Sequence, residues 1–242
     1  MKILYTLLFS FLLSSLHAEI NLAVAANMRE TMDLLVAEFQ KTSDVKINII
    51  SGASGELFHQ ISNGAPFQLF ISADTEYPKK LSQKKLTLDE PYIYAYGLLV
   101  IAGKNIKIKS LEDITNKKIS YIAIANPNLA PYGTKAMEIL KNQNLLDKIK
   151  TKIIFGNSIN DVNQLLLSGA VDIAFTNKSA VVLHQSLKYF EIPTDIYKPI
   201  PQAMVLIKNN DSKIVSEARL FYDFMKSQNA KQILINSGYL IP

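Results

Sequence analysis

The sequence of 242 residues predicts an α/β protein with two lobes, each a mostly parallel sheet flanked by helices. The first observation is that apolar strand-like runs alternate with amphipathic helical segments from Glu19 onward. The second is that two long apolar runs, residues 92–102 and 199–208, enclose a middle α/β set. The third is that no repeat, low-complexity stretch or linker-like segment divides the chain. The middle third is therefore expected to be inserted into the first lobe.

The two long apolar runs are the expected crossings between the lobes, and they form a hinge of two strands. On this division residues 19–97 and 202–242 form lobe 1, and residues 98–201 form lobe 2. Two lobes joined by such a hinge are typical of closure around a small solute.

The N-terminus predicts export. Residues 1–18 combine Lys2, an apolar run from Ile3 to Leu13 and a small-residue end at Ala18, as a signal peptide does. No later segment reaches the roughly 18 apolar residues of a membrane span, so we expect no membrane insertion. Because the chain has no cysteine, we expect no lipid anchor, and we expect a protein free in the periplasm.

The first strand, Glu19–Ala26, is followed by a helix whose apolar residues recur at helical spacing from Met28 to Phe39. Asn27 stands where the strand stops, and Glu30 follows three residues later. This spacing predicts Asn27 as the N-cap and Glu30 as its capping-box partner.

A βαβ unit occupies residues 44–74. A β-branched run ends in the small-residue turn 51–55, and an amphipathic helix follows it. A second apolar run, Leu69–Ile71, ends at Asp74, which is predicted to cap the next helix. Backbone N–H groups at the small-residue turn are unobstructed at a helix N-terminus, so the turn can hold an anion.

The middle and the tail continue the alternation of strands and helices. Ser110 is predicted to cap a short helix, Ser158 and Asp161 to form a capping box, and Gly169 to end the helix that follows. The remaining predicted elements are strands at 119–125, 153–155 and 171–175, and helices at 133–140, 212–225 and 229–235.

Composition excludes several classes of protein. The absence of cysteine excludes disulfides, thiolate metal sites and a cysteine nucleophile, and three widely spaced histidines give no metal-ligand pattern. The net charge of +5 is modest, and the densest lysines, Lys79, Lys80, Lys84 and Lys85, have no aromatic residues between them. They indicate a solvated helix face, and we expect no nucleic-acid partner.

Four turns share one design, in which a helix begins directly after the carboxyl end of a strand. They are Ala26-Asn27, Ala53-Ser54-Gly55, Pro131-Tyr132-Gly133 and Asp161-Val162. Ligands of open α/β sheets bind at this edge, where helix N-termini meet. None of the turns contains arginine, and neutral donors suit a desolvated dianion that must be released again.

The chain resembles the periplasmic molybdate-binding proteins that supply an ABC transporter. The resemblance is carried by AVAANM (23–28), SGASGELFHQISNGAPFQLFISAD (51–74), NPNLAPYGTKA (126–136) and NSINDVNQLLLSGAVDIAFTNKSAV (157–181), which cover most of the chain after residue 18. It implies the type II periplasmic binding protein fold, a molybdate or tungstate ligand, no other cofactor and no enzymatic activity. It also implies a monomer that delivers its ligand to a membrane permease.

The resemblance also implies the ligand-binding residues. They are Asn27 with Ala26 beside it, Ser54, and the backbone N–H groups of Tyr132 and Val162. Molybdenum is then bound as an oxyanion and not as a bare metal cation. Some family members use a tyrosine hydroxyl at the position of Phe175, which lacks that group, so Phe175 is left out of the expected ligand set.

Two alternatives remain open at this point. Another tetrahedral oxyanion such as sulfate fits the same neutral donors, and the absence of a carboxylate free to accept a proton disfavours phosphate. A secreted serine hydrolase would use Ser54, but Glu56 stands where a nucleophile elbow has its second glycine. His59 and His184 lack local partners and are expected to be surface residues outside any triad.

Overall fold

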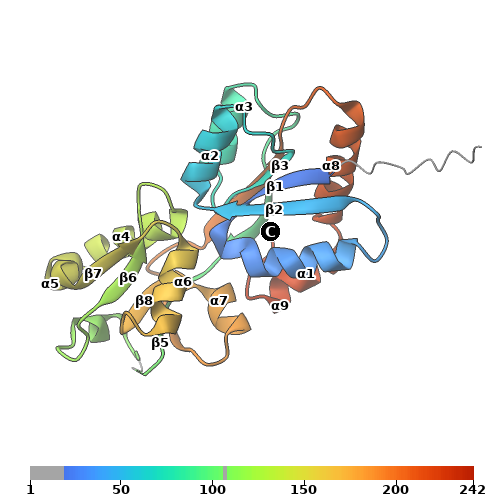
Figure 1. Cartoon of the computed structure of the whole chain (residues 1–242). Coiled ribbons are helices and arrows are strands. Elements are labelled where there is room, and N and C mark those ends of the chain that lie inside the picture. The colour runs from blue at the N-terminus through green and yellow to red at the C-terminus, as the bar shows by residue number, and fades with distance from the viewer. Residues whose placement is uncertain (1–18, 106–107) are drawn as a thin grey trace, which may run out of the picture.

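The computed structural model describes residues 19–105 and 108–242 (Figure 1). The predicted signal peptide, residues 1–18, lies outside the described residues. Within the described ranges no helix is both long enough and apolar enough to cross a membrane.

The first sheet has five strands in the order β2-β1-β3-β10-β4. Strand β1 runs parallel to β2 and β3, whereas β10 runs antiparallel to β3 and β4. The sheet is therefore mixed, because β10 runs against the other four strands. The strands are β1 (Glu19–Ala25), β2 (Lys46–Gly52), β3 (Leu69–Ile71), β4 (Tyr92–Gly97) and β10 (Ile200–Leu206).

Helices cover both faces of the first sheet, and together they form lobe 1 (Figure 1). One face packs on α1, α8 and α9 through a core that includes Met32, Leu35 and Phe221. The other face packs on α2 and α3 through Leu57, Phe70 and neighbouring residues. The helices are α1 (Arg29–Phe39), α2 (Ser54–Ser62), α3 (Glu76–Gln83), α8 (Ser212–Phe224) and α9 (Gln228–Asn236).

The second sheet, with its helices, forms lobe 2 and has the strand order β7-β6-β8-β5-β9. Strand β6 runs parallel to β7 and β8, and β5 runs antiparallel to β8 and β9. The strands are β5 (Leu99–Gly103), β6 (Ile122–Ala125), β7 (Ile153–Gly156), β8 (Ile173–Asn177) and β9 (Lys188–Glu191). The helical elements are η2 (Leu111–Thr115), α4 (Pro131–Asn142), α5 (Leu146–Ile149), η3 (Lys150–Lys152), α6 (Ile159–Ser168) and α7 (Lys178–Leu183).

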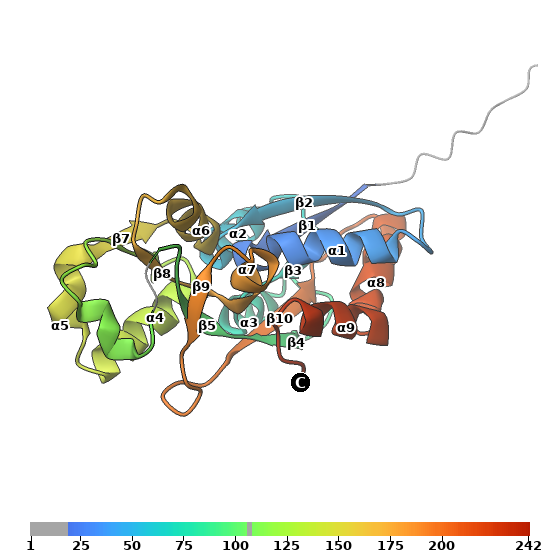
Figure 2. The ribbon, with the colours of Figure 1, turned by 90° about the horizontal axis from the view of Figure 1, so that it is seen from below.

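The chain passes between the lobes twice. The predicted run 92–102 is split into β4 and β5, which belong to different sheets and are separated by Leu98 alone. The predicted run 199–208 contains β10, which lies wholly in the first sheet, so the return crossing lies in residues 192–199. Figure 2 shows that α7 of lobe 2 lies beside α1 and α9 of lobe 1.

Local capping signals were predicted well where all partners lie within one turn. Ser158 and Asp161 form the capping box of α6, and Gly169 ends that helix with φ of +79°. The backbone N–H of Ser110 donates to Asp113 before η2. The Asp74 carboxylate accepts the backbone N–H of Tyr77 at 3.2 Å in the first turn of α3, which confirms its capping role.

The predicted capping box of Asn27 and Glu30 is wrong. Residues Ala26–Met28 form a 3-10 turn, η1, and α1 begins only at Arg29, with no side-chain cap. The Asn27 side chain instead donates to residues far along the chain, and Glu30 contacts His184. Both side chains therefore form hydrogen bonds with residues distant in the sequence, and they do not form the local capping box.

Candidate functional site

A small cavity lies between the lobes, at the carboxyl ends of strands from both sheets. Lobe 1 lines it with residues that include Ala26, Asn27 and Ser54, and lobe 2 lines it with residues that include Tyr132 and Ile159. The strand-to-helix turns after β1, β2, β6 and β7 thus meet at one place, as the alternation in the sequence predicts.

Ser54 is the first residue of α2 and is 1% exposed. Its hydroxyl oxygen accepts the backbone N–H of Ala73 at 3.0 Å. Because that contact uses a lone pair, the hydroxyl hydrogen remains available for a ligand. The Ser54 backbone N–H belongs to the first turn of α2, where N–H groups have no partner within the helix.

Tyr132 contributes its backbone to the cavity and its side chain to the protein interior. It is the second residue of α4, after Pro131, so its N–H also lies in a first helical turn. Its hydroxyl accepts a hydrogen bond from Gln202 Nε2 at 3.0 Å. Burial raises the pKa of the Tyr132 hydroxyl well above its ordinary value, so the group stays neutral.

Asn27 is 5% exposed, and its side-chain nitrogen and backbone carbonyl are hydrogen-bonded within the protein, whereas its buried Oδ1 has no hydrogen-bond partner among the described residues. Its Nδ2 donates to Gln202 Oε1 at 3.1 Å and to Tyr239 Oη at 3.2 Å. Its carbonyl oxygen accepts from Asn177, Ser179 and Tyr239 at 3.2, 3.2 and 2.8 Å. Both amide hydrogens are thus used within the protein, whereas the sequence had led us to expect a side-chain donor to the ligand.

Val162 is not among the residues that line the cavity. It is fully buried in the lobe 2 core, and its N–H donates to Ser158 O at 3.3 Å. The cavity is lined at this helix start by Ile159 instead. Phe175 is also buried in the lobe 2 core. Four of the five expected residues, Ala26, Asn27, Ser54 and Tyr132, therefore line the cavity, and Val162 does not.

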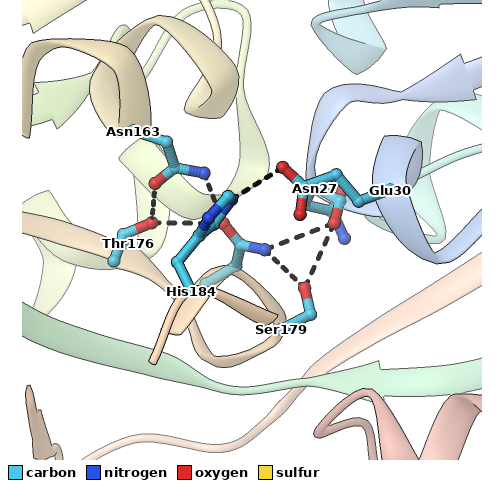
Figure 3. Close-up of polar contacts among 7 residues, drawn as sticks. Asn27, Glu30, Asn163, Thr176, Ser179 and His184 are labelled. Carbon is cyan, nitrogen blue, oxygen red and sulfur yellow. Dashed lines mark hydrogen bonds and ion pairs between the residues drawn. The ribbon is translucent and has the colours of Figure 1, made fainter. Parts of the chain in front are cut away.

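Hydrogen bonds cross between the lobes on several sides of the cavity. Gly55 N donates to Leu129 O at 2.9 Å, and Ser179 of lobe 2 donates to the carbonyl of Asn27. Figure 3 shows the second contact together with the 2.9 Å pairing of Glu30 with His184. His184 was expected to lack a local partner, and the partner that it has, Glu30, lies 154 residues away in the sequence.

The comparisons with known proteins agree with this architecture. A family model described as bacterial extracellular solute-binding protein matches residues 20–240. The chain belongs to this family of solute-binding proteins.

Relatives within the family are similar over most of their length. Molybdate-binding protein ModA of Azotobacter vinelandii is 31% identical, over 92% of this chain and 90% of the relative. Its counterpart from Rhodobacter capsulatus is 30% identical, over 92% and 88%. The solved structure of the Azotobacter vinelandii periplasmic molybdate-binding protein superimposes with a TM-score of 0.87, at 30% identity, over 92% of this chain and 99% of that one. The two-lobed type II fold is therefore confirmed.

This solute-binding protein is not an enzyme, because its family binds solutes and does not transform them. The geometry around Ser54 agrees with that conclusion. In the described part of the chain its hydroxyl is hydrogen-bonded to a backbone N–H and to no histidine. His184, the candidate base, is paired with Glu30.

The cavity of this solute-binding protein is lined without a charged side chain. Asp74, whose carboxyl group has a raised pKa, follows Ala73, the residue whose backbone N–H donates to Ser54. Burial raises its pKa to about 6 against hydrogen bonds from Ser72 and Tyr77 that lower it. In residues 19–105 and 108–242 no group of three or more His, Cys, Asp or Glu side chains is placed to hold a metal ion.

Four residues that support the cavity were missed in the sequence. Gln202 lies in β10, Tyr239 follows α9, and Asn177 and Ser179 flank the start of α7. All four reach Asn27 through hydrogen bonds. Gln202 and Tyr239 stand in apolar stretches without a motif, so only the fold could show their proximity to the site.

Proposed function

We propose that the protein captures molybdate between its lobes, accepts tungstate at the same site, and delivers the anion to the permease of an ABC transporter. The observation that carries the proposal is a cavity walled by neutral hydrogen-bond donors at helix N-termini of both lobes. The names of the relatives, which are molybdate-binding proteins at about 30% identity, support the choice of anion.

The donor set favours a fully deprotonated tetrahedral dianion. The partial positive charge of helix N-termini and the N–H groups in their first turns stabilise negative charge without a cation. The hydroxyl of Ser54 adds one side-chain donor. No carboxylate lines the cavity to accept the proton of a hydrogen phosphate ion, which disfavours phosphate.

Binding is proposed to couple to movement of the lobes about the two crossings, with residues 19–97 and 202–242 as one body and 98–201 as the other. The anion contacts both lobes, so it has higher affinity for the closed arrangement and shifts the equilibrium toward it. The closed form is the one presented to the permease. A signal peptide at residues 1–18 would export the protein to the periplasm. We propose that it acts there as a monomer, and that it is free of a lipid anchor because the sequence has no cysteine.

Thermal unfolding with each of four anions tests the proposal. Molybdate, tungstate, sulfate and phosphate are compared at matched ionic strength. A ligand at 1,000 times its dissociation constant adds about 4 kcal/mol to the free energy of unfolding. We expect a large rise in melting temperature with molybdate and tungstate alone. A rise with sulfate instead would overturn the assigned anion, and no rise with any anion would overturn the function.

A further inference from the structure

Gln202, a fully buried residue of β10, joins the two walls of the cavity. Its Oε1 accepts from Asn27 Nδ2 of lobe 1 at 3.1 Å, and its Nε2 donates to the Tyr132 hydroxyl of lobe 2 at 3.0 Å. We infer that Gln202 is a positioning residue that links closure of the lobes to assembly of the anion site. This inference rests on the proposed function, since it concerns affinity at the same cavity.

The Gln202 amide has a further polar neighbour in lobe 1, Tyr94. Tyr94 Oη lies 2.9 Å from Gln202 Oε1 and 3.0 Å from the carbonyl of Ser72, all within lobe 1. The single hydroxyl hydrogen of Tyr94 is shared between these two acceptors, so Asn27 Nδ2 is the undivided donor to Gln202 Oε1, and the amide directs its Nε2 at Tyr132. Rotating the amide by 180° would set its Nε2 against the Asn27 amide nitrogen, placing two donors face to face.

The hydrogen bond between Gln202 and Tyr132 lies beside Gly97, where the chain first crosses between the lobes. A methyl group added at Gly97, the last residue of β4, would lie 2.1 Å from Tyr132 Oη and 2.2 Å from Gln202 Nε2. Separations under about 3 Å are not tolerated between such atoms, and both side chains are buried and cannot move aside. The crossing backbone thus supports the bond between Gln202 and Tyr132, and it does so only because residue 97 has no side chain.

The bond joins two lobes, so it exists only when they are together. When the lobes separate, Gln202 stays with lobe 1 and Tyr132 leaves with α4. Inside the closed protein the bond is shielded from water, and the surrounding groups are uncharged amides and hydroxyls, which makes a completed network strong. The backbone N–H of Tyr132 is then held at the cavity by the side chain of the same residue. Closure of the lobes therefore forms the bond to Gln202 and positions the Tyr132 backbone N–H at the same time.

A double-mutant cycle measured by calorimetric titration with molybdate tests this coupling. Gln202→Met keeps the length of the side chain and removes its hydrogen bonds, and Tyr132→Phe removes the hydroxyl but keeps the backbone N–H. We expect each variant to raise the dissociation constant about 10-fold, the scale of one buried hydrogen bond. The double variant is expected to raise the dissociation constant about 10-fold to 20-fold relative to the wild type, and not about 100-fold, since both changes break the same bond.

Gln68→Met is the matched control. Gln68 is also a buried glutamine of lobe 1 with both amide atoms bonded, to Asn21 N and to Pro66 O, at the other end of β3. We expect it to lower the melting temperature of the ligand-free protein as Gln202→Met does, with an unchanged dissociation constant. Equal effects of the two glutamine changes on affinity would mean a merely structural role and overturn the inference.

Gly97→Ala tests the bond between Gln202 and Tyr132 independently, because the added methyl group would push the two side chains apart. We expect it to weaken molybdate binding and to reduce the ligand-induced decrease in the radius of gyration measured by X-ray scattering. If Gln202→Met does not fold, unchanged affinity in both Tyr132→Phe and Gly97→Ala would overturn the inference. Additive losses in the double variant would overturn it as well. Failure of the wild-type protein to bind molybdate would instead be a failure of the proposed function.

Discussion

At the scale of single residues, Ser54 is the clearest side-chain donor at the cavity. Its oxygen is occupied by the N–H of Ala73, so its hydrogen is directed away from that contact. A buried hydroxyl fixed in this way loses little freedom when it meets an anion. Asn27 differs, since both hydrogens of its amide are bonded to Gln202 and Tyr239.

Ser54→Ala is therefore expected to weaken molybdate binding by about 1.5–3 kcal/mol, the usual contribution of a hydrogen bond to a charged group. Isothermal titration of the purified variant measures this loss. Ser51→Ala, at an exposed residue near the end of β2, is the control and should bind as the wild type does. An unchanged dissociation constant in Ser54→Ala would remove Ser54 from the ligand set.

The sequence allowed Ser54 and Tyr132 to be found because their turns carry local signals, a small-residue loop and a proline at a helix start. The arrangement of Asn27 could not be found in that way. Its partners Gln202 and Tyr239 are 175 and 212 residues distant, and nothing in the sequence near Asn27 indicates them. Local propensity predicted a cap at this position, and tertiary hydrogen bonds prevailed over it.

At the scale of elements, the start of α3 combines a cap with a buried acid. The Asp74 carboxylate accepts from Ser72 Oγ at 2.9 Å and from Tyr77 N at 3.2 Å. Burial dominates over these bonds and raises the pKa of Asp74 from its ordinary 3.8 to about 6. The folded protein therefore holds a proton at Asp74 more tightly than the unfolded chain does. The resulting stabilisation is complete below pH 3.8 and is lost as the pH rises through 6.

We expect Asp74→Asn to abolish this pH dependence. An asparagine oxygen still accepts from Ser72 and Tyr77 but carries no titrating proton. Relative to this variant, the wild type should lose about 2 kcal/mol in free energy of unfolding between pH 4 and pH 7. Urea unfolding across that range measures the difference. Asp147→Asn, at a side chain that is 90% exposed, should follow the wild-type curve, and parallel curves for Asp74→Asn and wild type would contradict the assignment.

Elements were predicted where their own residues determine them. The apolar spacing of α1 and the capping box of α6 are local, and both appear in the structure. The short elements α7 and β9 have no comparable pattern and were not predicted. The split of the run 92–102 into β4 and β5 was also not visible, because both halves are apolar and the break depends on which sheet each half joins.

At the scale of the whole molecule, contacts between the lobes lie on both sides of the cavity. Gly55 meets Leu129 on one side, and Glu30 meets His184 on the other. The second contact joins α1 to the end of α7, near the network that holds the Asn27 carbonyl (Figure 3). The side chains of His184 and Glu30 are 35% and 50% exposed, so solvent screens the pair.

Exposed ion pairs contribute about 0–1 kcal/mol, so at a pH that protonates the imidazole His184→Ala is expected to weaken molybdate binding about 2-fold to 5-fold at low ionic strength. The loss arises because the pair stabilises only the arrangement in which the lobes are together, and the ligand favours the same arrangement. At high salt the difference from wild type should shrink, since screening has already removed most of the attraction. His59→Ala, at an exposed histidine on α2 that forms no ion pair in the described part of the chain, is the matched control and should leave the affinity unchanged. Titrations of both variants at two salt concentrations measure these effects. A loss of 100-fold or more in His184→Ala would mean that the histidine contacts the anion itself, and equal affinity at every salt concentration would mean that the pair has no part in closure.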